Sequence, residues 1–64
     1  MAELRGQLAC LCEQIAGVED SLALTLRDIA NTAPKQRAER LRKLAAAAQD
    51  YAATERDRAR EYSD

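Results

Sequence analysis

Cysteine chemistry is the first possibility that this sequence raises, because the chain has two cysteines and no histidine. Cys10 and Cys12 are two residues apart, so on a helix their side chains point about 200° away from each other. They can neither form a disulfide together nor bind one metal ion while the helix persists. We expect Cys12 to be a small buried apolar residue and Cys10 to face outward, and we predict no metal and no cofactor.

Acidic side chains offer another candidate chemistry, general acid and base catalysis. Glu19 and Asp20 are adjacent, and Asp57 and Glu61 are close together in the charged C-terminal segment. Both pairs fall on what the pattern indicates are helix surfaces, with no glycine-rich loop and no nucleophile beside a base. We therefore predict that the chain is not an enzyme and has no catalytic residues.

The elements that must position these residues are two helices separated by one break, at "NTAPK". Pro34 cannot continue a helix from its N-terminal side, but its fixed φ suits the first turn of a new helix. Val and Ile are scarce, Phe and Trp are absent, and no segment alternates with period two, so no strand is predicted. The prediction is an all-α fold in a single domain, 1–64, with helices at about 3–31 and 34–62 and a turn at 31–34.

Two repeating patterns predict how these helices pack. Apolar residues of the first helix follow the alternating spacing of a coiled coil, at Leu4, Leu8, Leu11, Ile15, Val18, Leu22, Thr25 and Ile29. Alanines recur every seven residues in both helices, at Ala2, Ala9, Ala16, Ala23 and Ala30 and at Ala38, Ala45, Ala52 and Ala59. Because large side chains opposite small ones fill a close helix contact, we predict a coiled-coil-type antiparallel hairpin with the Leu/Ile seam of the first helix against the Ala seam of the second.

This predicted contact is poorly matched at the open end of the hairpin. There Leu4, Leu8 and Leu11 meet the charged segment "TERDRAREYSD". Exposed leucines mark a partner surface or a second copy, and a chain of 64 residues is short enough to need such support. We predict a homodimer that forms a four-helix bundle. The predicted oligomer interface consists of Leu4, Leu8, Leu11, Ile15, Val18, Leu22, Ile29, Leu41, Ala45, Ala48 and Ala52.

The charge distribution indicates which classes of partner the chain could bind. A net charge of −1 lacks the strong positive field of a general nucleic-acid binder, although a basic cluster, "KQRAERLRK", begins the second helix. Basic residues would speed docking on an acidic protein surface, and aromatic residues would anchor the complex. The predicted partner-binding residues are Arg37, Arg40, Lys43, Tyr51 and Tyr62.

Nothing in the sequence suggests export or a membrane. Glu3 and Arg5 interrupt what would have to be the apolar region of a signal peptide, and no apolar run is long enough for a membrane span. We expect a cytoplasmic protein without membrane contact.

The turn region "SLALTLRDIANTAPKQRAERL", with the length and heptad plan of the chain, resembles Rop, the plasmid protein whose two-helix chains dimerise into a four-helix bundle. Rop binds RNA through a polar, basic and aromatic face of its first helix. The outer face here carries Glu13, Asp20 and Asp28 and no aromatic side chain, so the resemblance implies the architecture and not the RNA contacts.

The function predicted from these features is that of a non-enzymatic protein–protein interaction module. In this interpretation the homodimer binds a partner protein and modulates or inhibits it, as phage and plasmid regulators do. Two alternatives remain open: a Rop-like hairpin that binds RNA or DNA through the basic cluster at 35–43, and a secretion-system co-chaperone. Nucleic-acid binding should weaken steeply with salt, whereas association through leucines should not.

Overall fold

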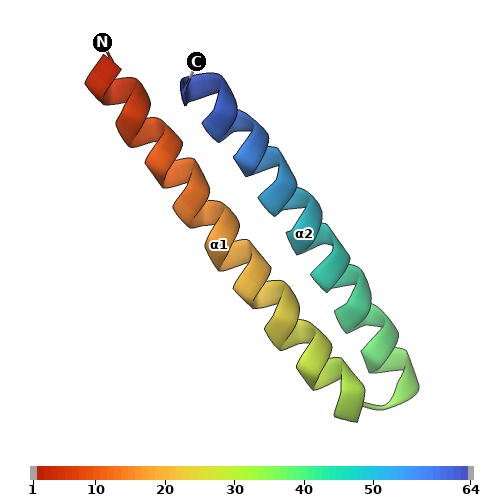
Figure 1. Cartoon of the computed structure of the whole chain (residues 1–64). Coiled ribbons are helices and arrows are strands. Elements are labelled where there is room, and N and C mark those ends of the chain that lie inside the picture. The colour runs from red at the N-terminus through yellow and green to blue at the C-terminus, as the bar shows by residue number, and fades with distance from the viewer. Residues whose placement is uncertain (1, 64) are drawn as a thin grey trace.

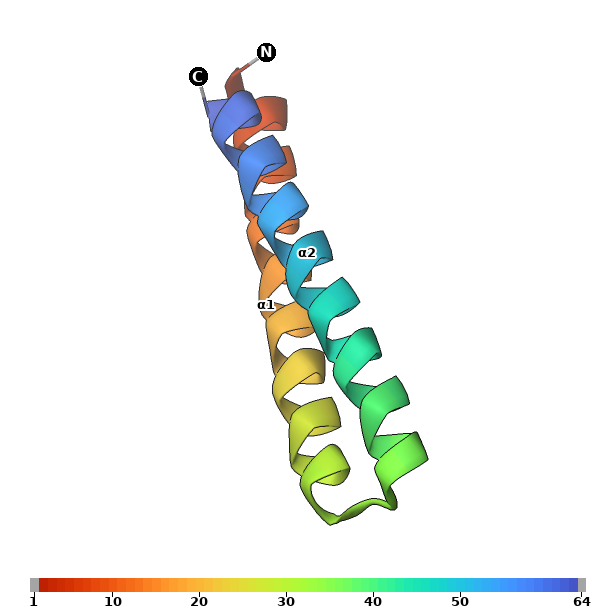
Figure 2. The ribbon, with the colours of Figure 1, turned by 90° about the vertical axis from the view of Figure 1, so that its right-hand side faces the viewer.

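The computed structural model describes residues 2–63, which form two long helices joined by a short turn. Helix α1 spans Ala2–Thr32 and helix α2 spans Lys35–Ser63. The helices lie side by side and antiparallel along their length, with both ends of the chain on one side and the turn on the other (Figure 1, Figure 2). The predicted all-α helical hairpin is confirmed, and the observed helix limits differ from the expected ones by one residue.

The turn needs only Ala33 and Pro34 between the helices. The carbonyl of Pro34 accepts the backbone N–H of Ala38 at 2.8 Å, which is the first helical hydrogen bond of α2. On the other side, the Thr32 hydroxyl donates to the carbonyl of Ile29 at 3.2 Å. This bond satisfies one of the carbonyls that the end of a helix leaves without a backbone donor. The chain therefore reverses sharply, and the two helices start their contact directly at the turn.

Alanines from both helices make the contact between α1 and α2. The buried alanines are Ala16, Ala23, Ala30, Ala38, Ala45, Ala48, Ala52 and Ala59, each at most 6% exposed. Ala23 clusters with Ala45 and Ala48, and the half-buried Leu26 packs against this cluster. Because alanines repeat every seven residues in both helices, the contact of Ala23 with Ala45 sets alanine opposite alanine along the pair.

The Leu/Ile seam of α1 does not pack against the alanines of α2, so this part of the predicted fold is wrong. Ile15 is 43% exposed and Leu22 is 46% exposed. Both precede a buried alanine by one residue, which turns them about 100° away from the contact. The physical reason is that alanine loses no side-chain entropy on burial and lets two helices approach closely, whereas a row of leucines would hold the axes further apart.

The close approach makes the hairpin long and thin. Its Cα atoms extend over 51 × 13 × 9 Å. Since the Cα atoms of a helix lie on a cylinder of about 2.3 Å radius, a width of 13 Å leaves about 8 Å between the two axes, the lower end of the range for packed helices. Among the residues that the structure describes, no large side chain is fully buried.

One side of the pair, called the polar face below, carries the polar contacts between the helices. Arg56 forms an ion pair with Asp20, and Arg27 Nη2 donates a hydrogen bond to Gln49 Oε1 at 2.6 Å. Each of these four residues follows a buried alanine by four positions, so all four lie on the same side of the contact. Exposed pairs of this kind stabilise little, typically less than about 1 kcal/mol each, and we interpret them as fixing the register of the helices.

A larger side chain on the alanine seam should destabilise the hairpin. Replacing Ala45, which is fully buried, by leucine forces the helices apart and should lower the free energy of unfolding by about 1–3 kcal/mol. The matched control is Ala46→Leu, one position further on at an exposed site, where the change should be small. Urea unfolding at a fixed protein concentration measures both, and equal losses at the two sites would refute the close alanine contact.

Candidate functional site

The side of the pair opposite the polar face is called the apolar face below. On both helices it contains the residues that precede a buried alanine by one position. On α1 it also contains the neighbouring row of Leu4, Leu11 and Val18. Its large exposed side chains are Leu4, Leu11, Ile15, Val18, Leu22, Ile29, Leu44 and Tyr51, each between 43% and 68% exposed. On α1 these side chains continue from the open end of the hairpin to the turn. An apolar surface this continuous is typical of an interaction site.

Two adjoining hollows run along the apolar face. The larger, about 370 Å³, lies between the helices, and its lining includes Leu22 and Leu26 of α1 and Leu44 and Tyr51 of α2. The smaller, about 290 Å³, lies nearer the open end. Glu19 lines both hollows, so they adjoin along the apolar face and could receive side chains of another helix.

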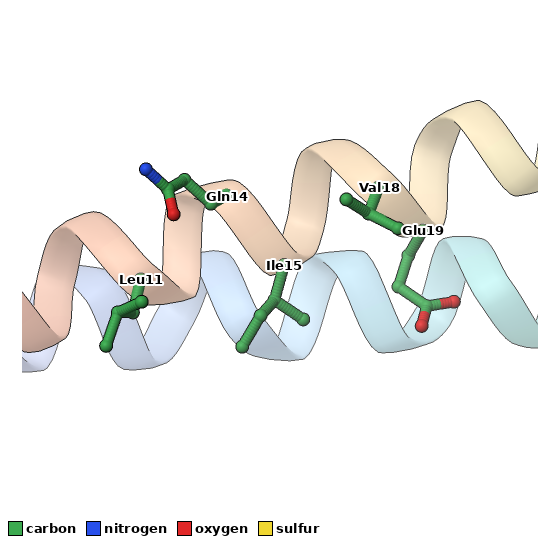
Figure 3. Close-up of a pocket in the computed structure, with 5 residues that line it drawn as sticks. All are labelled: Leu11, Gln14, Ile15, Val18 and Glu19. Atoms are coloured by element: carbon green, nitrogen blue, oxygen red, sulfur yellow. The ribbon is translucent and has the colours of Figure 1, made fainter.

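The smaller hollow shows how α1 presents its apolar side chains. Leu11 and Ile15 point to the same side of the helix in Figure 3, while Gln14 points away from them. Leu11 and Ile15 are one helical turn apart and therefore stack along the helix. The row on α1 thus has the geometry of a helix-packing surface, and α2 lies behind it without covering it (Figure 3).

The structure divides the residues predicted for the oligomer interface into two groups. Those of α1 lie on the apolar face: Leu4, Leu8, Leu11, Ile15, Val18, Leu22 and Ile29. Those of α2 lie in the contact within the hairpin: Leu41, Ala45, Ala48 and Ala52. Because α1 already covers the three alanines of the second group, a contact with another chain would be made mainly by the first group.

Two of the predicted partner-binding residues lie on the apolar face near the turn. Arg37 precedes Leu44 by seven residues, and Arg40 precedes Ala47 by seven. Residues two full turns apart occupy the same row of a helix, so both arginines extend the rows that carry Leu44 and Ala47. They line a hollow of about 200 Å³ beside Pro34. The apolar face therefore becomes basic on α2 as it approaches the turn.

The other predicted partner-binding residues are not brought together. Tyr51 is 59% exposed and lies in the groove between the helices. Lys43 is exposed and precedes Ala45 by two positions, which turns it about 200° from the contact between the helices. Tyr62 lies in the last turns of α2 and is 36% exposed. The two arginines and Tyr51 share one face. Tyr62 lies on the same side of α2 as Tyr51 but three turns further on, at the open end, and Lys43 points outward.

A buried polar contact near the open end was not predicted from the sequence. Glu55 is 4% exposed, and Arg58 Nη1 donates a hydrogen bond to its Oε1 atom at 2.7 Å. Cys12 of α1 lies beside it. Burial raises the pKa of the Cys12 thiol above its ordinary value, and the carboxylate of Glu55 raises it further. Glu55 belongs to the charged segment at the open end, and its contact with Cys12 depends on the exact register of the two helices.

The described residues offer little support for other kinds of site. Within residues 2–63, no group of three or more His, Cys, Asp or Glu side chains could hold a metal ion. Neither of the two described helices combines the length and the apolar character that crossing a bilayer requires.

Comparison of the chain with protein-family models, curated proteins and solved structures finds no match.

The two cysteines should differ in reactivity. In single-cysteine variants made by replacing the other cysteine with alanine, Cys12 should react with a thiol-specific disulfide reagent at least about tenfold more slowly than Cys10, because Cys12 is buried and its raised pKa leaves less thiolate. Adding Glu55→Gln to the Cys12 variant should speed the reaction, since it removes a charge that raises this pKa. Equal rates for the two cysteines would contradict the buried position of Cys12.

The raised pKa of Cys12 also predicts how stability depends on pH. The folded chain holds the thiol proton more tightly than the unfolded chain does. This contribution to stability is present below the pKa of the unfolded thiol and is lost as the pH rises through the higher folded pKa. Unfolding measured across the alkaline range should therefore show a steeper loss for the wild type than for Cys12→Ala.

Proposed function

We propose that this chain is a non-enzymatic protein–protein interaction module that works by burying its apolar face against helices of another chain. The observation that carries the proposal is the continuous row of half-exposed leucine, isoleucine and valine side chains along α1. The simplest assembly that covers this row is a homodimer in which two hairpins form a four-helix bundle. The bundle then presents its remaining surfaces to a further protein and modulates or inhibits it.

The contrast between the two sides of the hairpin supports this proposal. On the polar face, Asp20 and Arg56 pair across the helices, as do Arg27 and Gln49. No apolar row of comparable length lies there among the described residues, and Leu24 is the large apolar side chain on that side. A single chain therefore pairs polar side chains across its polar face, whereas the large side chains of its apolar face stay in contact with water. Burying a leucine side chain contributes about 1.5–3 kcal/mol of free energy. Covering several leucines would therefore add apolar burial that the contact between alanines lacks.

The placement of the basic residues favours a protein partner over nucleic acid. Arg37 and Arg40 extend the apolar face, Lys43 points outward, and Lys35 and Arg42 lie in the row of the polar face. The five therefore surround the first turns of α2 and do not form one stripe. A phosphate backbone is tracked best by basic side chains along a single face, whereas a basic end suits an acidic protein surface.

The test of this proposal uses two leucines that flank the buried Ala23. Leu22 lies on the apolar face and is 46% exposed, whereas Leu24 lies on the other side and is 64% exposed. Leu22→Asp should raise the dimer dissociation constant at least about tenfold, because it removes a buried leucine from each chain. Leu24→Asp should leave it within about twofold, since that side chain stays in solvent. Sedimentation over a dilution series measures both.

Folding and assembly can fail together in such a variant, because a dimer stabilises its folded chains by mass action. Loss of both helix content and dimers in Leu22→Asp, with both retained in Leu24→Asp, therefore supports the proposal equally well. A wild-type chain that stays a folded monomer at about 100 µM would overturn it, since an interface of standard size associates well below that concentration.

A further inference from the structure

We infer that the occupant of the apolar face is a second copy of this chain in one particular orientation. The turn of each copy lies over the open end of the other, so that α1 packs on α1 and α2 packs on α2. This inference rests on the proposed self-association and adds its geometry. Three independent observations support it: the exposed area, the extent of the apolar rows, and the distribution of charge.

The exposed area matches what a dimer of standard size would bury. A compact monomer of 7.1 kDa should expose about 4,100 Å², whereas the hairpin exposes 4947 Å². The excess of roughly 850 Å² is close to the roughly 800 Å² that each partner buries in a standard protein interface. One face-to-face contact of standard size with another hairpin would therefore reduce the exposed area of each chain to that of a compact monomer of the same mass.

A two-fold axis can place the apolar face against itself in two ways. If the axis runs along the hairpin, both turns lie at the same end and α1 of one copy packs on α2 of the other. If the axis crosses the hairpin, the turns lie at opposite ends and each helix packs on its own counterpart. The apolar rows and the charges both distinguish between these arrangements.

The apolar rows favour the arrangement with turns at opposite ends. On α1 the row continues over the whole helix. On α2 it is limited to the segment around Leu44 and Tyr51 and to Tyr62, and Arg58 and Glu61 continue the rows of Leu44 and Ala47 towards the open end. Packing α1 on α2 would therefore set the leucines of the open end against charged residues. Packing α1 on α1 covers the apolar row of each copy with the same row of the other copy. An axis crossing α1 near residues 16 and 17 pairs Leu4 with Ile29, Leu11 with Leu22, and Ile15 with Val18 of the second copy.

The charges favour the same arrangement. Residues 27–43, around the turn, hold six basic and two acidic side chains, a net charge of +4. The open end, residues 2–13 and 54–64, holds four basic and six acidic side chains, a net charge of −2. With the turns at the same end, two segments of charge +4 would repel each other. With the turns at opposite ends, each positive segment lies over a negative one, which selects this orientation without requiring any single ion pair.

The orientation determines which surfaces remain for another partner. Both polar faces point outward, and the two basic turns lie at opposite ends of a particle about as long as one hairpin, 51 Å. The dimer would thus offer two identical basic ends to acidic surfaces, and each end would bind independently of the other.

Distances between spin labels in the full-length chain test both the assembly and its orientation. Labels are placed at Asn31→Cys, beside the turn, and in a second variant at Ala53→Cys, in the middle of α2. Both sites are exposed and lie away from the apolar face, and the natural cysteines are replaced as Cys10→Ser and Cys12→Ala. Helix content by circular dichroism and sedimentation confirm that each labelled variant still behaves like the wild type.

The central label at position 53 should give a distance below about 30 Å in either orientation, because a bundle of two layers of helices is about 20 Å thick. The label at position 31 should give about 48 Å. This combines about 44 Å along the helices, since the label lies between 14 and 15 residues from the axis in each copy at 1.5 Å per residue, with about 20 Å across the bundle. Both results together support the inference.

The two ways of failing can be told apart. A distance below about 30 Å at both positions would show a dimer with its turns together and would overturn the orientation, while the proposed self-association would stand. Absence of dipolar coupling at both positions, at a concentration where the chain is folded, would overturn the self-association and the orientation with it.

Discussion

The contact between two rows of alanines is the constraint on which the rest of this structure depends. With Ala23 against Ala45 and the same pairing repeated every seven residues, the two helix axes come within about 8 Å of each other. Residues before and after each alanine are then turned to opposite sides of the pair. The alanine contact therefore produces both a polar face with contacts between the helices and an apolar face that α2 leaves uncovered.

The same contact leaves a single hairpin with little buried apolar area. Alanine methyl groups bury little apolar area, and among the described residues no large side chain is fully buried. The buried carboxylate of Glu55 is held by Arg58 and occupies a position where an apolar side chain would have added to the core. A chain of this length with a core of small residues is at the limit of independent stability. Assembly through the apolar face would provide the missing burial.

The sequence predicts the hairpin well and the packing within it poorly. Pro34 and the absence of strand patterns were sufficient to place two helices and a turn. The seam was misassigned because α1 carries two heptad rows one residue apart: Leu8, Ile15, Leu22 and Ile29, and the alanines that follow them. Hydrophobicity favours the leucine row as the core, but hydrophobicity cannot distinguish burial within a chain from burial between chains. The seven-residue period of alanine, which is the same in both helices, could have shown that the alanine row of α1 faces α2.

Methyl–methyl nuclear Overhauser effects within one labelled chain test the alanine contact most directly. The sample carries ¹³C-labelled alanine, leucine, isoleucine and valine methyl groups and is diluted with unlabelled protein to suppress signals between chains. We expect a cross-peak between Ala23 and Ala45 and another between Ala16 and Ala52. We expect weaker or missing cross-peaks from Val18 to these alanines of α2. Strong cross-peaks from Val18 and Leu22 to Ala45 and Ala52, without the alanine pairs, would place the leucine row inside the hairpin and contradict the account.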